Sequence, residues 1–259
     1  MHSHINFGYP WQITYGYLFV TAVALPLGLL SWHKHWPKIV SVILAAATLW
    51  SLAAFSLMRF ALDINGRMPL PTEAFLRSGS GRVLDIGAGT GRSTLMVLEA
   101  RPQTTVVALD SFSDSYVGHF GSKGTGQSIP DQGRERLMAN LRAAGVDNRA
   151  SVEAADMRQL PFPPASFDGI VSAYTFEHLR RKGIEQAMAE ASRVLKPGGE
   201  FLLVVLSKDL WLTLMQGPIA MHSHLPGRDA WMQFLHDAGF QVVEDGTRPG
   251  TMYFLARKS

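Results

Sequence analysis

Val83-Leu84-Asp85-Ile86-Gly87-Ala88-Gly89-Thr90-Gly91 is the stretch that decides the fold of this chain. An apolar run leads into three alternating glycines, which predicts a buried strand, a sharp turn and then a helix over about Arg92–Ala100. Glycine has no Cβ, so this turn can approach a ligand closely, and the first N–H groups of the helix lack intrahelical partners. A carboxylate at Asp85 suits a ligand with an ammonium group better than one with a pyrophosphate. Arg92 stands where the dinucleotide pattern G-x-G-x-x-G has its last glycine, which disfavours a nicotinamide site.

Further strand signals follow this turn in a regular order. Asp110 ends the apolar run Thr105–Leu109, where an acidic side chain can accept hydrogen bonds from two ribose hydroxyls. Three more strands are expected at Val152–Met157, Phe167–Ala173 and, after the turn Leu195–Gly199, Phe201–Leu206. Helices are expected over 134–144, 183–194 and 229–238, and a final strand pair over 241–243 and 251–256. Strands that alternate with helices in this way predict a parallel sheet.

The order and spacing of these motifs resemble the class I S-adenosylmethionine-dependent methyltransferases, and within them the UbiE-like, or methyltransferase type 11, group. The resemblance covers about Thr72–Lys258. It implies an α/β, Rossmann-like fold with a seven-stranded sheet and helices on both faces. It also implies S-adenosyl-L-methionine as the cofactor and methyl transfer as the reaction (EC 2.1.1.-).

The same resemblance implies the cofactor contacts, residue by residue. The cofactor-binding residues that it implies are Asp85, Gly87, Ala88, Gly89, Gly91, Asp110, Ser111, Asp156, Met157, Ser172, Ala173 and Tyr174. Asp85 and the glycine turn would hold the methionine moiety, Asp110 the ribose hydroxyls and Asp156 the adenine amino group. Met157 would pack on the adenine ring, and Tyr174 would lie near the methyl group. The remaining residues would line the turn and the floor of the site.

Candidate catalytic residues follow the fourth expected strand, in Tyr174-Thr175-Phe176-Glu177-His178-Leu179. Methyl transfer is an in-line displacement at a sulfonium, so positioning dominates and a base is needed only if the acceptor carries a proton. Histidine changes charge nearest to neutral pH, which makes His178 the candidate base. Glu177 could orient it or bind a cation, or the pair could simply cap the following helix. The Phe-Glu-His run is also similar to cyclopropane-fatty-acid synthases, which leaves methylene transfer to an acyl chain open.

The first 62 residues contain no Asp or Glu and hold two apolar runs, about Trp11–Trp32 and Ile39–Leu62. Each run reaches the roughly 20 residues that a membrane span needs, and aromatic residues gather near the ends. The pattern predicts a two-helix transmembrane hairpin that contacts the membrane through residues 11–62. A cleavable signal peptide is disfavoured because no Lys or Arg precedes residue 34. A core hairpin of a soluble protein is disfavoured because the runs have no polar face.

Charge and composition exclude several classes of function. Three of the 24 Lys and Arg residues lie in residues 1–62, and the other 21 equal the 21 acidic residues, so the net charge of +3 belongs to the hairpin. The pI near 9.3 therefore gives no indication of nucleic-acid binding. The absence of cysteine excludes disulfides, thiolate metal sites and cysteine nucleophiles. The spacing of the histidines predicts no metal site.

We therefore expect three parts: a transmembrane hairpin over 1–62, a linker with a short helix near Thr72–Leu76 over 63–80, and a methyltransferase domain over 81–259. Because S-adenosylmethionine is made in the cytosol, the domain is expected to face the cytoplasm in a multi-pass membrane protein, of the cytoplasmic membrane if bacterial. The expected function is methyl transfer to a small, lipophilic acceptor. A non-catalytic membrane scaffold or sensor that binds the cofactor is the alternative from another class.

Overall fold

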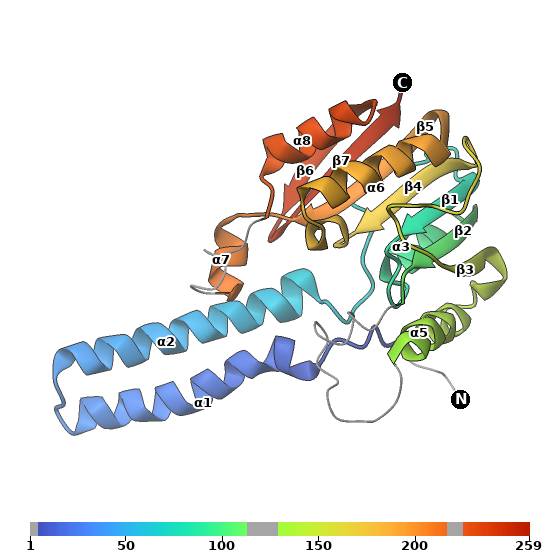
Figure 1. The fold of residues 1–259 in the computed structure, drawn as a ribbon. Coiled ribbons are helices and arrows are strands. Elements are labelled where there is room, and N and C mark those ends of the chain that lie inside the picture. The colour runs from blue at the N-terminus through green and yellow to red at the C-terminus, as the bar shows by residue number, and fades with distance from the viewer. Residues whose placement is uncertain (1–4, 113–128, 217–224) are drawn as a thin grey trace. The chain divides into compact units, whose positions relative to one another are not determined.

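The computed structural model describes residues 5–112, 129–216 and 225–259 (Figure 1). The chain forms two compact units, which we call the sheet unit (Met1–Gly8, Asn65–Lys208 and His224–Ser259) and the hairpin unit (Tyr9–Ile64 and Asp209–Ser223). The first change of unit after the hairpin, at residues 64 and 65, falls close to the boundary expected at residue 62. Two short segments pack away from their neighbours in sequence: residues 5–8 belong to the sheet unit, and residues 209–216 belong to the hairpin unit.

The sheet unit is built on a seven-stranded sheet with the order β3-β2-β1-β4-β5-β7-β6. Its strands are β1 Ser80–Ile86, β2 Gln103–Asp110, β3 Ala150–Ala154, β4 Phe167–Ala173, β5 Leu195–Leu206, β6 Phe240–Arg248 and β7 Thr251–Lys258. The first five strands are parallel, and β7 is antiparallel to both β5 and β6. The strand order reverses at β1, between β2 and β4, and ligands of such sheets bind at the carboxyl ends of the strands at this point. The predicted Rossmann-like α/β fold is confirmed.

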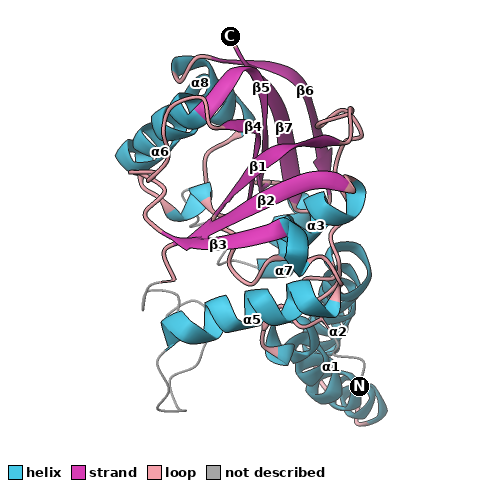
Figure 2. Cartoon of the chain, turned by 90° about the vertical axis from the view of Figure 1, so that its right-hand side faces the viewer, coloured by secondary structure: helices cyan, strands magenta, loops and turns pink. Residues whose placement is uncertain are grey.

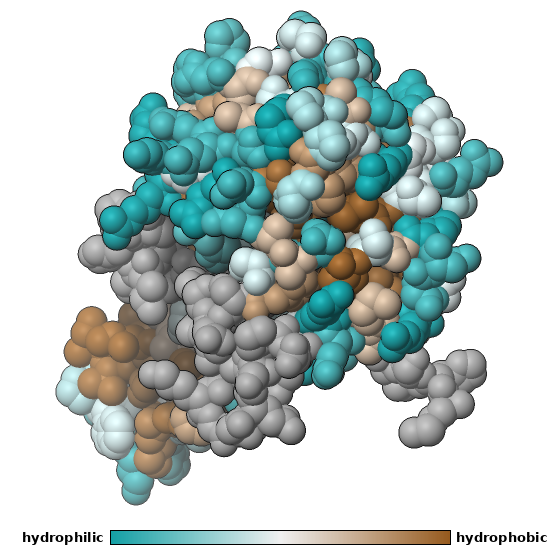
Figure 3. All heavy atoms as spheres, turned by 45° about the vertical axis from the view of Figure 1, so that its right-hand side comes forward, coloured by the Kyte–Doolittle hydropathy of each residue, from teal (hydrophilic) through white to brown (hydrophobic). Residues whose placement is uncertain are grey.

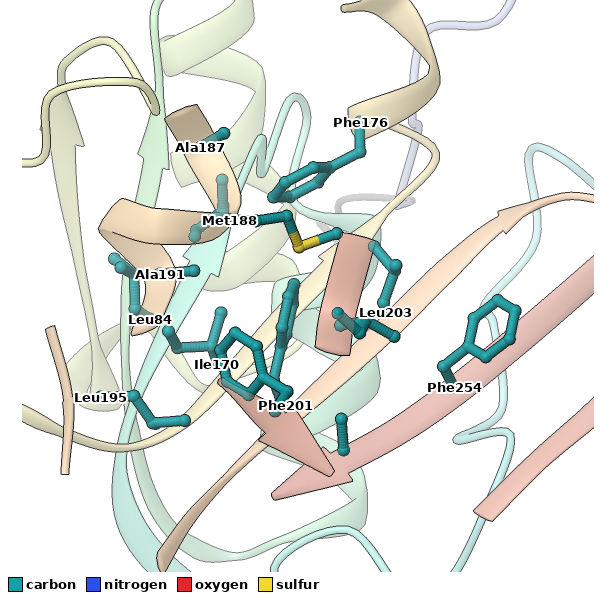
Figure 4. Packing of buried hydrophobic residues seen from close by; sticks show 14 of the residues in the cluster. Leu84, Ile170, Phe176, Ala187, Met188, Ala191, Leu195, Phe201, Leu203 and Phe254 are labelled. Atoms are coloured by element: carbon teal, nitrogen blue, oxygen red, sulfur yellow. The ribbon is translucent and has the colours of Figure 1, made fainter. Parts of the chain in front are cut away.

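Helices cover both faces of the sheet, with α6 and α8 on one face and α3 on the other (Figure 2). The helices of the sheet unit are α3 Arg92–Ala100, α5 Ile129–Ala143, α6 Arg181–Val194 and α8 Arg228–Asp237, with short 3-10 turns η2 Asp147–Arg149 and η3 Phe176–His178. Figure 4 shows the core under α6, where Leu84 and Ile170 of the sheet meet Ala187 and Met188 of the helix beside Phe201. All five side chains are buried. This packing fixes the carboxyl ends of β1 and β4 against each other.

Several elements differ from the sequence-based expectation. The expectation of a short helix near Thr72–Leu76 is wrong, because residues 73–78 form turns. The Thr72 hydroxyl accepts the N–H of Ala74, and the carboxylate of Glu200, on β5, accepts the N–H of Leu76, whose φ is +44°. The expected turn Leu195–Gly199 is the first part of β5, and β6 continues to Arg248, well beyond its expected end. Helix α5 begins at Ile129, five residues before the start expected at residue 134.

The hairpin unit contains α1 Trp11–His33, α2 Lys38–Ser56, the π-helix η1 Leu57–Leu62 and α7 Leu210–Gln216. Two of its helical stretches, Trp11–His33 and Lys38–Leu62, are long and apolar enough to cross a membrane. The residues buried in α1 and α2 are small or carry hydroxyls: Thr14, Ala24, Ser31, Thr48, Ser51 and Ala54. Hydroxyl pairs join the two helices, Thr21 with Ser51 at 2.6 Å and Ser31 with Ser41 at 2.8 Å.

The outer surface of the hairpin is apolar by contrast. Phe19 is 76% exposed, Leu49 69% and Val42 61%. In Figure 3, brown, hydrophobic atoms gather on the hairpin, whereas the surface of the sheet unit is largely teal. The hairpin therefore reverses the arrangement of a water-soluble helix pair, because its polar side chains face inward and its large apolar side chains face outward.

Candidate functional site

The glycine turn between β1 and α3 has the backbone conformation that its sequence predicts. Gly87, Gly89 and Gly91 have φ values of +77°, +53° and +91°, in the left-handed region that favours glycine. A Cβ at position 87 would collide with the side chain of Thr175, which follows β4. The segments that follow β1 and β4 therefore approach each other so closely here that only glycine fits at position 87.

Backbone groups fasten this turn to the carboxyl end of β2. The N–H groups of Gly87 and Ala88 donate to the carbonyl oxygen of Leu109 at 2.8 and 3.0 Å. The N–H of Gly89 donates to Asp110 Oδ2 at 2.9 Å. The acidic residue expected to meet the ribose thus also holds the middle glycine in place.

Asp110 is buried at the end of β2, where it is 6% exposed. Its Oδ1 accepts the N–H of Phe112 at 3.0 Å. Burial raises the pKa of the Asp110 carboxyl, and the N–H donors of Phe112, Gly89 and Ser111 oppose that rise. Each carboxylate oxygen can accept more than one hydrogen bond, so two ligand hydroxyls could still bind beside the backbone donors.

We expect an Asp110→Ala variant to bind S-adenosylhomocysteine more weakly by ~1.5–3 kcal/mol, the usual range for a hydrogen bond to a charged group. The fold should survive, because Asp110 lies at the end of β2 and is not part of the hydrophobic core cluster. Isothermal titration calorimetry measures the affinity, and Asp147→Ala, at an exposed acid in η2, is the control. An unchanged dissociation constant in Asp110→Ala would place the ribose partner elsewhere.

Asp85 lies at the end of β1 with no exposed surface. Its Oδ2 accepts the hydroxyls of Ser93 and Thr94, at 2.8 and 2.5 Å, so the carboxylate is tied to the first turn of α3. Its Oδ1 is buried and has no hydrogen-bond partner among the described residues. Burial raises the pKa of Asp85 to about 7. A buried carboxylate with a spare oxygen is suited to a cationic or N–H donor, which would stabilise its ionised form.

The adenine side of the expected site lies at the end of β3. The N–H of Ala155 donates to the carbonyl oxygen of Asp110 at 3.1 Å, which places the end of β3 beside the end of β2. Asp156 is exposed and forms an ion pair with Arg158 at 2.5 Å, which lowers the pKa of Asp156. Met157 is partly buried and packs against the core. A ligand that reached Asp156 would compete with Arg158 for its oxygens.

The residues expected on the floor of the site are fastened within the sheet. The Ser172 hydroxyl donates to the carbonyl oxygen of Ile86 at 2.7 Å, so this buried side chain joins β4 to β1 and is committed to the backbone. Tyr174, directly after Ala173, has a φ of +55°, and its hydroxyl lies 3.1 Å from Thr251 Oγ1. Burial raises the pKa of the Tyr174 hydroxyl. A non-glycine residue in the left-handed region marks a constrained position, of the kind that gathers at functional sites.

Glu177 and His178 line a pocket of about 610 Å³ at the carboxyl ends of β4 and β5. The other residues that line it are Leu179, Arg180, Arg181, Ile184, Leu225, Pro226, Ala230 and Phe234. Glu177 Oε1 accepts the N–H of Leu206, at the end of β5, at 3.1 Å. Its Oε2 is buried without a partner among the described residues, and burial raises the pKa of Glu177 to about 7. His178 is exposed at the same pocket.

This geometry bears on the helix-capping interpretation of the Glu-His pair. The N-cap of α6 is Arg180, and no side-chain hydrogen bond caps it. The Glu177 carboxylate contacts β5 instead of the start of α6. The described part of the chain contains no group of three side chains that could hold a metal ion. The pocket is therefore lined by both polar and apolar side chains, and one oxygen of the Glu177 carboxylate in it has no hydrogen-bond partner among the described residues.

Sequence reasoning missed a second contact on the glycine turn. Asn140 of α5 is 2% exposed, and its amide donates to the carbonyl oxygens of Thr90 at 2.9 Å and Asn6 at 3.1 Å. The N–H of Asn6 donates back to Asn140 Oδ1, and the Thr90 hydroxyl donates to the carbonyl oxygen of Phe7. Residues 6–8 therefore form a strap, which we call the N-terminal strap, across the glycine turn. A polar Asn140 between the buried Leu137 and Leu141 was the available signal.

Comparisons with known proteins agree with this geometry. The family described as "Methyltransferase domain" matches residues 84–203. The "Ubiquinone/menaquinone biosynthesis C-methyltransferase UbiE" of Azotobacter vinelandii is 33% identical over 150 residues, which are 58% of this chain and 48% of that protein. The "27-O-demethylrifamycin SV methyltransferase" of Amycolatopsis mediterranei is 34% identical over 134 residues, which are 50% of this chain and 41% of that protein.

A solved structure shows the same fold. A crystal structure of an S-adenosylmethionine-dependent methyltransferase from Methanosarcina mazei has a TM-score of 0.53 at 18% identity, covering 70% of this chain and 93% of that chain. The chain spans less than half the length of the two curated relatives described above. The family match, over residues 84–203, lies in the sheet unit.

Proposed function

Because this chain carries a class I S-adenosylmethionine-dependent methyltransferase domain, we propose that the protein transfers a methyl group from S-adenosylmethionine to a small, lipophilic acceptor at a membrane surface. The observation that carries the proposal is the glycine turn at the switch point of the sheet, which Asp110 holds through Gly89. The relatives' names, which mention quinones and rifamycin, support a small-molecule acceptor.

The residues at this end of the sheet fit the cofactor. Its ammonium group would meet Asp85, whose Oδ1 is buried without a partner among the described residues. Its ribose would meet Asp110, and its adenine would lie toward Asp156 and Met157. When bound, S-adenosylmethionine supplies a methyl group on a sulfonium, which is open to in-line displacement. The turn residues of this chain would orient that group, and Tyr174, directly after β4, would lie near it.

The pocket beside Glu177 would hold the acceptor. Leu179, Ile184 and Phe234 give it an apolar wall, which suits a lipophilic molecule. Glu177 Oε2 can accept a proton from an O–H or N–H of the acceptor while that atom takes the methyl group. The proton on Glu177 would then pass to solvent through the exposed side of the pocket at His178.

The hairpin supports attachment to a membrane. In water, a pair of helices gains stability by burying its large apolar side chains, but this pair buries hydroxyls and alanines. In lipid there is no such driving force, and helices associate through small residues and hydrogen bonds such as those between Ser31 and Ser41 or Thr21 and Ser51. We infer that both helices span the membrane and that the sheet unit faces the cytoplasm, where the cofactor is made.

We expect the full-length protein to stay in the membrane pellet after alkaline carbonate extraction. A variant in which a flexible linker replaces residues 9–64 should move to the supernatant while keeping the N-terminal strap and the sheet unit. Immunoblotting of both fractions measures this. Recovery of the full-length chain from the supernatant without detergent would mean that the hairpin is not a membrane anchor.

The activity itself is tested by incubating the membrane-embedded protein with methyl-labelled S-adenosylmethionine and a lipid extract. We expect labelled lipid by mass spectrometry together with S-adenosylhomocysteine. Cofactor binding without either product would favour the scaffold or sensor function. Label that appears as a new cyclopropane ring would favour methylene transfer.

A further inference from the structure

Helix α7, Leu210–Gln216, follows β5 and packs within the hairpin unit. It contacts α2 and η1. Leu212 is 2% exposed, whereas Leu210 is 78% exposed and Trp211 47% exposed. This helix therefore presents large apolar side chains on its outer surface as well as toward its neighbours. Neighbouring Leu and Trp side chains that are exposed in this way are typical of a surface that contacts a membrane or another apolar partner.

A hydrogen bond fixes the depth of α7 along the hairpin. Trp50 Nε1 donates to the carbonyl oxygen of Leu214 at 2.7 Å. The apolar stretch Lys38–Leu62 has 25 residues and is about 37 Å long, against a hydrocarbon thickness of about 30 Å. Trp50 is twelve residues from either end, so it lies near the middle of the stretch. Since α7 also contacts η1, it lies along the half that runs from Trp50 to Leu62.

The partners in this bond are those that a lipid environment requires. A carbonyl oxygen near the end of a short helix has no intrahelical partner, and in water the solvent would satisfy it. In hydrocarbon no solvent is available, and an unsatisfied polar group costs several kcal/mol. The indole N–H of Trp50 satisfies the carbonyl of Leu214, and the carbonyl satisfies the indole. At the other end, Asp209 Oδ1 accepts the N–H of Leu212 at 2.9 Å.

We propose that α7 is a third membrane-contacting element, which lies in the leaflet beside the second half of α2 with Leu210 and Trp211 against the lipid. The partner of this surface is the bilayer itself, because α7 contacts α2 and η1, which also expose large apolar side chains such as Leu49 and Phe60. The proposal rests on the proposed membrane anchor. It adds that the chain enters the lipid a second time, between the end of β5 and the pocket residues Leu225 and Pro226.

The absence of cysteine from the chain allows a direct test in the full-length protein. Single-cysteine variants Leu210→Cys, Ile43→Cys and Asp229→Cys are labelled with the environment-sensitive fluorophore NBD and placed in phosphatidylcholine vesicles. Ile43 is 59% exposed on α2 and reports on the anchor, whereas the fully exposed Asp229 of α8 is the aqueous control. Some vesicles contain phosphatidylcholine with a doxyl quencher, either near the headgroup or near the chain end.

We expect the Leu210 label to be blue-shifted and quenched by at least half as much as the Ile43 label, more strongly by the quencher near the headgroup. The Asp229 label should be unaffected. A Leu210 label that behaves like the Asp229 label while the Ile43 label is quenched would overturn the role of α7 and leave the anchor standing. Failure of quenching at both Leu210 and Ile43 would overturn the anchor and the proposal together.

Discussion

A Gly89→Val variant is expected to show no measurable binding of S-adenosylmethionine or S-adenosylhomocysteine. Gly89 has a φ of +53°, where a β-branched side chain is strongly disfavoured, and its N–H holds the Asp110 carboxylate. The substitution therefore moves two parts of the cofactor site at once and places a side chain in the path of the ligand. Isothermal titration calorimetry with both ligands and with NAD measures the loss. Tight binding of NAD by the unmodified protein, without binding of S-adenosylhomocysteine, would contradict the cofactor assignment.

The control for backbone strain is Gly79→Val. Gly79 precedes β1 at the other end of the strand, has a φ of +77° and has nothing within 4 Å of an added Cβ. This variant should unfold at a lower temperature but bind S-adenosylhomocysteine with unchanged affinity. If it loses binding as completely as Gly89→Val, strain alone explains the effect, and the position of Gly89 in the site does not.

A Glu177→Gln variant is expected to lower turnover by about 10²–10⁴-fold if the acceptor carries a proton, the usual contribution of a general base. The amide keeps the shape of the side chain and its carbonyl can still accept the N–H of Leu206. Affinity for S-adenosylhomocysteine should hold, because Asp85 and Asp110, which are expected to hold the cofactor, lie at the ends of β1 and β2. A His178→Ala variant made in parallel assigns the base: if His178 is the base, it shows the larger loss.

The pH dependence of turnover gives an independent check. Only the ionised Glu177 can accept a proton, and its pKa is raised to about 7, so turnover should rise as pH rises through about 7. The residual activity of Glu177→Gln should not show this rise of turnover with pH. If the rise through about pH 7 persists unchanged in this variant, another group is responsible for it.

If Glu177 has only a structural role, its substitution should change the pH dependence of stability and leave turnover unchanged. Its pKa is raised above its ordinary value of 4.5, so between that pH and about 7 the folded protein binds more protons than the unfolded chain. The free energy of unfolding therefore falls as pH rises through this window, by up to about 1.4 kcal/mol per pH unit for this group. Glu177→Gln should remove the contribution of Glu177 to this fall in the free energy of unfolding. Asp85, whose pKa is raised in the same direction, should still contribute its own fall. Flattening with normal turnover would remove Glu177 from the chemistry.

The parts of the fold that were predictable from the sequence are those with a local cause. The alternating glycines, the apolar strands and the acidic residues at the strand ends of β1 and β2 all lie within a few residues of the features that they form. The short helix near Thr72–Leu76 failed because it was decided elsewhere: Glu200, on β5, accepts the N–H of Leu76. Local helix propensity cannot register a contact across 124 residues.

The same distinction applies to the site. The spacing of the motifs correctly predicted that Asp110 lies beside the glycine turn. It could not show that the Ser172 hydroxyl donates its hydrogen bond to the carbonyl oxygen of Ile86. It could not show that Glu177 has a buried carboxylate oxygen while His178 is exposed, because the Glu177 carboxylate packs against the distant end of β5. The sequence suggested Tyr174 as a site residue only because it follows β4, and it gave no indication of the hydrogen bond between Tyr174 and Thr251 on β7.

The N-terminal strap sets an order of events during synthesis. Residues 6–8 leave the ribosome before the hairpin, but their partner Asn140 is made 132 residues after Gly8, or roughly 7–26 s later at 5–20 residues per second. Both apolar helices emerge in that interval. Under the proposed membrane anchoring, the insertion machinery would receive the hairpin while the sheet unit is still incomplete, and the unit closes only when its first and middle segments meet. Slowing elongation before codon 140 should prolong the lifetime of a protease-sensitive nascent chain.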